Sequence, residues 1–220
     1  MTNTGVTKCK NRLTIDYRLV NQKVIHNRPF KMPLIEELLN KAAKTGKVFS
    51  CFDGVNFFFQ IKIAKESMDV TSFYWYSKIF SFVCCPQGLK TSPNFAQRCT
   101  NCICSAVGDK ICLGYIDDFL LASETFQEHL LHLRKFLSTI SFYQVKLSGA
   151  KMSLGRTRQN FLGFSVSNRK IYRIQDQKVD SIKEIARPTC RKTLMSYLGL
   201  LSWFSHSSPL RDCMKPLREI

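Results

Sequence analysis

Hydrophobic and polar residues alternate in short runs along the chain, and turn residues separate the runs. Such alternation, and apolar runs of about four to eight residues, are typical of β-strands. One run, 47–52, ends on Asp53 and Gly54. Two others, 111–113 and 119–121, flank Asp117 and Asp118 and predict a hairpin capped by these residues, because Asp tolerates the positive φ of a two-residue turn. The remaining predicted strands are 12–17, 60–63, 70–76 paired with 78–85 about Ser77, and 161–166 paired with 170–174 about Asn168 and Arg169.

Start and stop signals predict the helices. Pro33, followed by two Glu residues, opens a helix that runs to about Lys44. Ser92 as N-cap opens a helix that Gly108 closes. A capping box at 125–128 opens the next helix. Glu36, Glu37 and Gly46 are further signals for the first helix, and Pro93 is one for the second. Two more helices are predicted at 177–186 and 192–205, separated by Pro188.

Two helices carry stripes that predict which face is buried. In 92–107 the apolar positions at helical spacing are Phe95, Cys99, Cys102 and Ala106; in the helix opened at Thr125 they are Phe126, Leu130, Leu133, Leu137 and Ile140. His129 and His132 fall on the wetter side of this second helix, which indicates solvated residues and not metal ligands. Helices and antiparallel strands are interspersed without regular βα alternation, so the predicted class is α+β.

Composition bounds the kind of protein. The 220 residues allow one large domain or two small ones, and 45% hydrophobic residues with 17 Phe suffice for a core. No run approaches the ~18 apolar residues of a membrane span, and residues 1–5 lack a secretion signal. Ten Cys in such a chain predict reduced thiols and an intracellular, cytoplasmic setting. Cys99, Cys102 and Cys104 lack a second ligand pair at finger spacing, so they are interpreted as small buried hydrophobes and not as zinc ligands.

Charge narrows the range of partners. Thirty-three Lys and Arg residues against 16 Asp and Glu give a net charge of +17, which favours a polyanion such as nucleic acid. The plainer alternative is a basic surface that serves solubility alone. A membrane surface is a weaker alternative, because no single helix concentrates the charge.

Three carboxylates carry the candidate chemistry. Asp117 and Asp118 taken alone are compatible with an ordinary polar turn. Asp53 at the end of another predicted strand changes that interpretation, because neighbouring strands lie ~4.8 Å apart and would bring the three groups together. Carboxylate oxygens are ligands for Mg²⁺ or Mn²⁺, and two such ions would promote phosphoryl transfer. The residues alone therefore predict metal-dependent phosphoryl transfer on nucleic acid.

The motifs resemble those of reverse transcriptases, in family order over nearly the whole chain. Tyr115-Ile116-Asp117-Asp118 between apolar flanks resembles the catalytic motif of this family, and the remaining motifs resemble gypsy-type LTR retrotransposons and, more distantly, retroviruses. The other similar segments are 12–21, 49–53 with Gln60-Ile61, Thr71-Ser72-Phe73, 86–93 with Phe95 and Gln97, 128–133, Phe161-Leu162-Gly163 with Val166-Ser167, and Leu198-Gly199-Leu200 with Trp203-Phe204.

The resemblance implies a right-hand polymerase: a palm with a ferredoxin-like antiparallel sheet and helices, partial fingers and the start of the thumb. It assigns 1–46 to the fingers, 47–175 to the palm with an inserted fingers segment at about 62–90, and 176–220 to the start of the thumb or connection. It implies an RNA-directed DNA polymerase that uses two Mg²⁺ or Mn²⁺ ions, a dNTP and an RNA or DNA template–primer. RNase H, integrase and protease domains of a longer Pol polyprotein, and a virus-like particle, belong to the same expectation.

Roles follow position by position from the resemblance. Asp53, Asp117 and Asp118 would hold the metals, and Lys151 would protonate the leaving pyrophosphate. The ring of Phe58 would exclude a ribose 2′-OH. The other implied nucleotide-binding residues are Arg12, Lys10, Gln87 and Tyr115, and the implied primer-positioning residues are Phe161, Leu162 and Gly163.

Departures from the family pattern leave alternatives open. Phe57 replaces a small residue and is expected to crowd the sugar pocket, Gly54 replaces an apolar residue, and Asn11 replaces an aromatic. With the short chain, these departures favour a second hypothesis: a catalytically inactive, truncated remnant that binds nucleic acid. A viral RNA-templated RNA polymerase is a third, against which Phe58 speaks.

Overall fold

The computed structural model describes residues 15–23, 30–173 and 187–202. The chain divides into two compact units, Met1–Arg173 and Ile174–Ile220. In the second unit the described helix is α7 (Arg191–Ser202), which agrees with the helix predicted to begin at Lys192. The predicted helix 177–186 lies outside the described residues. No helix among the described residues has the length and apolarity to cross a bilayer.

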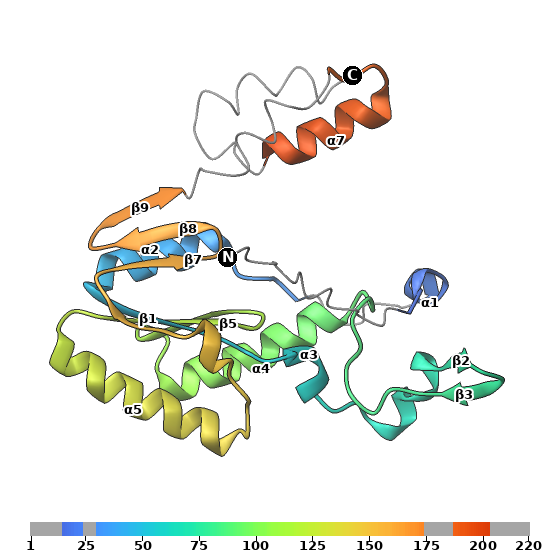
Figure 1. Cartoon of the computed structure of the whole chain (residues 1–220), viewed down its shortest axis with the longest axis horizontal. Coiled ribbons are helices and arrows are strands. Elements are labelled where there is room, and N and C mark those ends of the chain that lie inside the picture. Colours follow the sequence, from blue (N-terminus) through green and yellow to red (C-terminus); the bar gives the residue numbers. More distant parts are fainter. Residues whose placement is uncertain (1–14, 24–29, 174–186, 203–220) are drawn as a thin grey trace, which may run out of the picture. The chain divides into compact units, whose positions relative to one another are not determined.

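A four-stranded antiparallel sheet forms the centre of the first unit (Figure 1). Its strands are β1 (Val48–Asp53), β4 (Cys112–Tyr115), β5 (Asp118–Ser123) and β6 (Ser153–Arg156), in the spatial order β4-β5-β1-β6. Along the chain, α4 (Ser92–Val107) connects β1 to β4, and α5 (Phe126–Phe142) connects β5 to β6. This βαββαβ order is that of a ferredoxin-like sheet, so the predicted α+β palm is confirmed.

Hydrophobic layers cover both faces of this sheet, because side chains alternate between faces along each strand. Helices α4 and α5 pack on one face, where Phe52 and Phe119 meet Phe136. Helix α2 (Ile35–Thr45) and a second sheet pack on the other face, where Phe49 and Leu120 are buried (Figure 1). That second sheet has the order β7-β8-β9, formed by β7 (Arg158–Phe161), β8 (Phe164–Ser167) and β9 (Lys170–Arg173).

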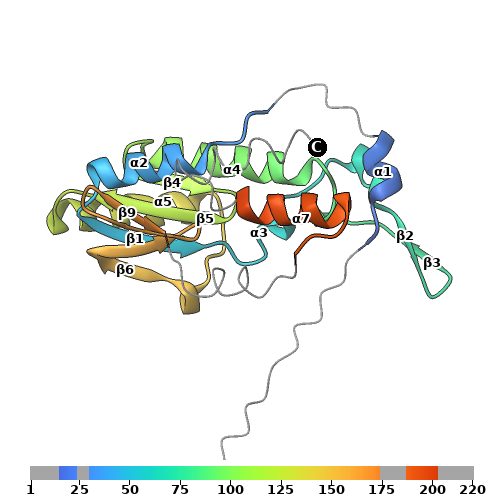
Figure 2. The ribbon, with the colours of Figure 1, turned by 90° about the horizontal axis from the view of Figure 1, so that it is seen from above.

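A smaller region extends beyond the N-terminal end of α4 (Figures 1 and 2). It contains the hairpin of β2 (Phe73–Trp75) and β3 (Lys78–Phe80), two 3-10 turns, η1 (Lys65–Ser67) and η2 (Asp69–Thr71), and helix α1 (Arg18–Lys23). Tyr17 ties this region together, because its buried hydroxyl donates to the carbonyl oxygen of Thr71 at 3.1 Å. The hairpin was predicted, but its strands are shorter than predicted because 69–71 forms a helical turn.

The predicted ends of α2 and α4 agree with the structure to within about two residues, and the predicted end of the helix 192–205 lies outside the described residues. Both halves of the predicted capping box of α5 are present: the Thr125 hydroxyl accepts from the Glu128 amide, and the Glu128 carboxylate accepts from the Thr125 amide. Gly108 ends α4 with φ 126°, a conformation that suits glycine. Ser92 lies inside α4 and Thr91 is its N-cap, so the predicted N-cap was wrong by one residue.

Several predicted strands were wrong. Residues 57–60 form the short helix α3 (Phe57–Gln60), and 60–63 is not a strand. The predicted strand 161–166 is split by a turn at Leu162 and Gly163, where φ is 50° and 82°. Residues 15–17 are not a strand, and 12–14 lie outside the described residues.

Both predicted helix stripes were displaced. On α4, Phe95, Cys102 and Ala106 are exposed and Cys99 is half-buried, whereas Cys104 is buried as predicted. On α5, Phe126, Leu130 and Leu137 are exposed, and the buried face carries His129, Phe136 and Ile140. His129 is fully buried and not solvated, because its ring nitrogens bond the hydroxyls of Ser50 and Ser123 at 2.6 and 2.8 Å. A polar residue with two buried partners can thus replace an apolar one on a helix face.

Candidate active site

Two of the three predicted carboxylates face each other across the central sheet. Asp53 is the last residue of β1 and lies directly opposite Asp118, the first residue of β5. On the other side of β5, Asp118 pairs with Tyr115 at the end of β4. Side chains directly opposite in an antiparallel pair share a face, so like charges there repel unless a cation separates them.

The third carboxylate lies in the turn that joins β4 and β5. Tyr115 and Asp118 are paired, so the turn residues are Ile116 and Asp117 and not the predicted Asp117 and Asp118. The positive φ of this turn, 55°, belongs to Ile116. The carbonyl oxygen of Asp117 accepts from the amide of Gly54 at 2.8 Å, which fixes the turn against the end of β1. Asp53, Asp117 and Asp118 are thereby brought together.

A β-branched residue at positive φ is strained, and helix α4 supplies the contacts that hold it. The amide of Ile116 donates to Gln97 Oε1 at 2.8 Å, and Gln97 Nε2 donates to the carbonyl oxygen of Gly114 at 3.0 Å. The Thr100 hydroxyl donates to the carbonyl oxygen of Ile116. Gly114 permits this close approach, because a Cβ there would overlap the Thr100 methyl group.

Sequence reasoning placed Gln97 in a family motif but assigned no role to it, and it missed Thr100. Both side chains are fully buried on α4. Two uncharged polar residues three positions apart on an otherwise apolar helix face were the available signal. Such a pair indicates that backbone groups of a neighbouring segment require partners there.

Burial and the neighbouring negative charges both raise the pKa values of Asp117 and Asp118. Desolvation, followed by the charges of Asp117 and Asp53, raises the pKa of Asp118 to about 6. Desolvation also raises the pKa of Asp117, with a further contribution from Asp53. A cation at this position would reverse both effects, because it stabilises the ionised forms.

One cation of the chain already lies at the cluster. Lys151 Nζ lies 2.7 Å from Asp53 Oδ1, and this contact raises the pKa of the Lys151 ammonium group. Lys151 ends the short turn η3 (Gly149–Lys151), which is anchored because the amide of Ser148 donates to the carbonyl oxygen of Asp53 at 2.8 Å. The predicted catalytic lysine is therefore in contact with a predicted metal ligand.

The carboxylates fit a hard divalent cation by their chemistry, since all their donor atoms are oxygens. Within the described residues, no three such side chains are already arranged around one point as a ligand set. Lys151 occupies one oxygen of Asp53. A metal ion that binds Asp53 would therefore share this carboxylate with the Lys151 ammonium group or replace that group.

Phe57 points into the core, contrary to the expectation that it crowds a sugar pocket. Its ring is buried and meets Phe119 edge to face at a centroid distance of 6.1 Å. It also lies over Gly54, where a Cβ would be 2.8 Å from Phe57 Cδ2. The two departures from the family pattern therefore compensate each other. Phe58, the next residue of α3, is half-buried against the same core.

Gln60 fixes the position of α3 and was missed as a supporting residue. Its amide nitrogen donates to the carbonyl oxygens of Val55 and Lys146 at 2.6 and 3.0 Å. Its amide oxygen accepts from the amide of Lys146 at 2.7 Å. These bonds join α3 to the segment that leads to Lys151.

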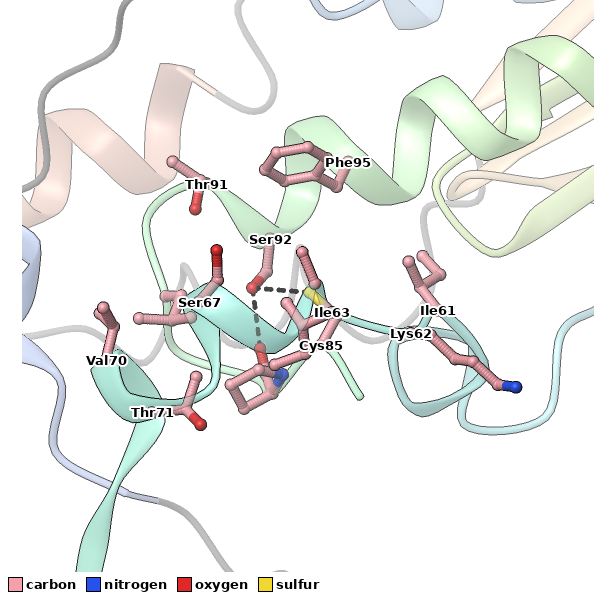
Figure 3. A pocket seen from close by; sticks show the side chains of 13 residues that line it. Ile61, Lys62, Ile63, Ser67, Val70, Thr71, Cys85, Thr91, Ser92 and Phe95 are labelled. Atoms are coloured by element: carbon pink, nitrogen blue, oxygen red, sulfur yellow. Dashed lines mark hydrogen bonds between the residues drawn. The ribbon is translucent and has the colours of Figure 1, made fainter. Parts of the chain in front are cut away.

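Gln87 is partly exposed on a loop that is held on both sides. On one side of the loop, the Asn21 side chain of α1 donates to the carbonyl oxygen of Gly88 at 2.8 Å and accepts from the amide of Lys90 at 2.7 Å. On the other side, the Ser92 hydroxyl donates to the carbonyl oxygen of Pro86 at 2.8 Å and accepts from the Cys85 thiol at 3.1 Å (Figure 3). The loop conformation is therefore defined from two directions.

Figure 3 shows the cavity behind this loop. It has a volume of about 310 Å³, and its lining includes Ile61, Ile63, Val70, Pro86, Leu89 and Phe95. Burial raises the pKa of the Cys85 thiol, so this thiol is a structural group and not a nucleophile.

The remaining predicted site residues occupy different environments. Phe161 is buried in the core between the central sheet and α2, so its ring is not available to a ligand. Leu162 and Gly163 form the β7–β8 turn, and Tyr115 is half-buried beside Asp118. Arg12 and Lys10 lie outside the described residues.

Comparison with known proteins identifies similar sequences. Residues 5–166 match the family described as reverse transcriptase (RNA-dependent DNA polymerase). The chain is 31% identical over 209 residues to the retrovirus-related Pol polyprotein from transposon 297 of Drosophila melanogaster, covering 94% of this chain and 20% of the relative. It is 29% identical over 214 residues to the enzymatic polyprotein of figwort mosaic virus, covering 95% and 31%. The chain therefore spans only about a fifth to a third of these relatives.

Similar solved structures come from foamy virus. The protease–reverse transcriptase dRH in complex with double-stranded DNA has a TM-score of 0.76 and 27% identity, over 94% of this chain and 36% of that one. The protease–reverse transcriptase in complex with an RNA/DNA hybrid has a TM-score of 0.74 and 26% identity, over 94% and 28%. These structures share the arrangement of helices and strands described above.

Proposed function

Because this chain belongs to the reverse transcriptase family, we propose that it is the polymerase core of a longer Pol polyprotein and adds dNTPs to a primer 3′ end on an RNA or DNA template. The observation that carries the proposal is the meeting of Asp53 and Asp118 in direct register, with Asp117 fixed beside them. A net charge of +17 suits a nucleic-acid substrate.

Asp53, Asp117 and Asp118 are the residues that would hold two Mg²⁺ or Mn²⁺ ions. When bound, such ions would lower the pKa of the attacking hydroxyl and balance negative charge on the leaving pyrophosphate. The desolvation that raises the pKa of Asp118 supports this role, because buried like charges favour a divalent cation.

The chain's own side chains complete the reaction. Released from Asp53, the Lys151 ammonium group donates a proton to the leaving pyrophosphate. The half-buried ring of Phe58, fixed by the packing of α3, leaves no room for a ribose 2′-OH and thereby selects dNTPs. Gln87 and Tyr115 contact the nucleotide, and Arg12 and Lys10 neutralise its triphosphate.

The primer end is positioned by the β7–β8 turn. Leu162 and Gly163 present the backbone of this turn, and the buried ring of Phe161 anchors it in the core. Holding the 3′-hydroxyl near the nucleotide favours in-line attack, because the reacting groups are already oriented. The foamy virus proteins are in complex with double-stranded DNA and with an RNA/DNA hybrid, which supports a nucleic-acid partner for this chain.

Primer extension tests the proposal. A radiolabelled DNA primer on an RNA template, with Mg²⁺ and dNTPs, should be extended by the full chain and not by the Asp117→Asn variant. Failure of the folded chain to extend while it still binds the template–primer would contradict the proposal and favour the inactive remnant. Preference for NTPs over dNTPs would favour an RNA polymerase.

A further inference from the structure

The hairpin of β2 and β3 exposes aromatic side chains at its apex. Tyr74, Trp75 and Tyr76 have 78%, 52% and 86% of their surface exposed. Figures 1 and 2 show this hairpin projecting away from the central sheet. Contiguous exposed aromatic surface of this kind marks an interaction site more often than chance exposure.

Both residues of the hairpin turn have a backbone conformation that residues other than glycine rarely adopt. Tyr76 and Ser77 are the two turn residues, and both have positive φ, 44° and 62°. A turn with this backbone favours Asn-Gly, because bulky residues are disfavoured at positive φ. Tyr76 is a poor residue for the turn and contacts no core, so folding alone does not account for it.

The base of the hairpin is rigid, and the apex is preorganised. At the base, the ring of Phe73 lies against Phe80 and Phe82, with centroids 6.1 and 5.4 Å apart. At the apex, Trp75 and Tyr76 meet edge to face with centroids 5.2 Å apart. Rings held in this way lose little conformational entropy when a ligand stacks on them.

Charge indicates what kind of ligand the apex fits. Between Ser72 and Cys85 the chain has Lys78 and no Asp or Glu. Aromatic faces combined with positive charge are the features that bind single-stranded nucleic acid, because every unpaired base has a face available for stacking. Paired bases inside a duplex do not offer these faces. A basic chain with +17 net charge adds to the attraction.

We infer that the Trp75–Tyr76 apex is a stacking platform for unpaired bases of a template strand. The inference rests on the proposed function for the identity of that strand. The hairpin continues through Cys84 and Cys85 into the loop that carries Gln87, so a short segment of chain connects the apex to the loop proposed to contact the nucleotide.

The test uses variants that keep the hairpin folded. Tyr76→Asn with Ser77→Gly gives a turn better suited to positive φ and removes the ring. Trp75→Ala removes the other ring. Binding of the full chain to a fluorescein-labelled single-stranded RNA of about 12 nucleotides, within the range of site sizes for stacking proteins, is measured by anisotropy in EDTA. Each change should weaken binding about tenfold, whereas affinity for a blunt duplex should be unchanged.

A matched control exists on α5. Phe142 and Tyr143 form a similar edge-to-face pair with centroids 5.2 Å apart, and Phe142 is 81% exposed. Phe142→Ala should leave RNA affinity unchanged. In a Trp203→Phe background Trp75 is the only tryptophan, and its fluorescence should be quenched by single-stranded RNA and not by the blunt duplex.

Three results would overturn the inference: unchanged RNA affinity in both apex variants, equal losses for single strand and duplex, or a change in sedimentation without a change in RNA affinity. The last result would identify the apex as a protein-docking surface instead. The outcome is separate from that of the polymerase proposal, because binding in EDTA needs no catalysis. Apex-dependent RNA binding by a chain that cannot extend a primer would refute only the proposed activity.

Discussion

The ring of Phe57 occupies the space that a side chain at position 54 would need, since a Cβ at Gly54 would lie 2.8 Å from Phe57 Cδ2. Phe57 is buried against Phe119, so its ring contributes to the core. This pair removes one reason to regard the chain as an inactive remnant.

A double-mutant cycle tests this compensation. Phe57→Ala should destabilise the protein by about 3–5 kcal/mol by opening a cavity, and Gly54→Val should destabilise it by steric overlap. In the double variant the valine enters the space vacated by the ring, so the loss should be smaller than the sum of the single losses. Urea denaturation measures all three. Strict additivity would show that positions 54 and 57 do not share this space.

Gln97 is expected to control the geometry of the Ile116–Asp117 turn. Gln97→Ala leaves the Ile116 amide and the Gly114 carbonyl without their partner, which costs about 1–3 kcal/mol for each buried group. Primer extension at saturating dNTP should fall about tenfold or more, since small displacements of catalytic groups carry large rate penalties.

Asn101→Ala is the matched control for Gln97. The Asn101 side chain accepts from Gln97 Nε2 at 2.9 Å, but it is exposed and does not bond the turn. Its removal should change extension and stability only slightly. Equal effects of the two substitutions would mean that Gln97 does not act through the turn.

The sequence was most informative where local chemistry decides the structure. The capping box at Thr125 and the strand that ends at Asp53 depend on neighbouring residues, and both are present in the structure. The buried faces of α4 and α5 were less predictable, because Gln97 and His129 are buried where they hydrogen-bond to groups distant in the chain. Hydrophobic spacing cannot register such partners. The position of the turn was missed for a similar reason, since α4 stabilises a positive φ at Ile116 that the residue itself disfavours.

His129 should make stability depend on pH. Desolvation lowers the pKa of its buried ring below the ordinary 6.5, so the folded state favours the neutral form. The unfolded chain takes up a proton near pH 6.5 before the folded chain does. The contribution of neutral His129 to the free energy of unfolding is therefore fully present above pH 6.5 and is lost as pH falls toward the lowered pKa. The free energy of unfolding then changes by at most about 1.4 kcal/mol per pH unit.

Urea denaturation of the wild type and of His129→Gln between pH 5 and 8 would measure this effect. The stability difference between the wild type and His129→Gln should change with pH across this range. The difference between the wild type and His132→Gln should change much less, because desolvation and not the charge of His132 is the main cause of the lowered pKa of His129. His132 is suited as the control because it bonds the same Ser123 hydroxyl at 2.8 Å but is only partly buried. Taking differences between variants cancels the titration of the carboxylates. An unchanged slope in His129→Gln would refute the assignment.

Asp118 should contribute to stability with the opposite pH dependence. Desolvation and the charges of Asp117 and Asp53 raise its pKa from 3.8 to about 6, so the folded state favours the protonated form. Its contribution is fully present below pH 3.8 and is lost as pH rises through about 6. At neutral pH and without divalent metal, the ionised Asp118 therefore destabilises the fold.

Asp118→Asn should stabilise the metal-free protein at pH 7 by about 1–2 kcal/mol, after allowance for solvent screening of a half-buried group. Addition of Mg²⁺ should raise the thermal midpoint of the wild type more than that of the variant, because the ion binds and stabilises the ionised carboxylate in the folded state. Thermal denaturation in EDTA and in Mg²⁺ measures both effects. If Asp118→Asn destabilised the metal-free protein, or gained as much as the wild type from Mg²⁺, Asp118 would be a structural residue and not part of the cation site.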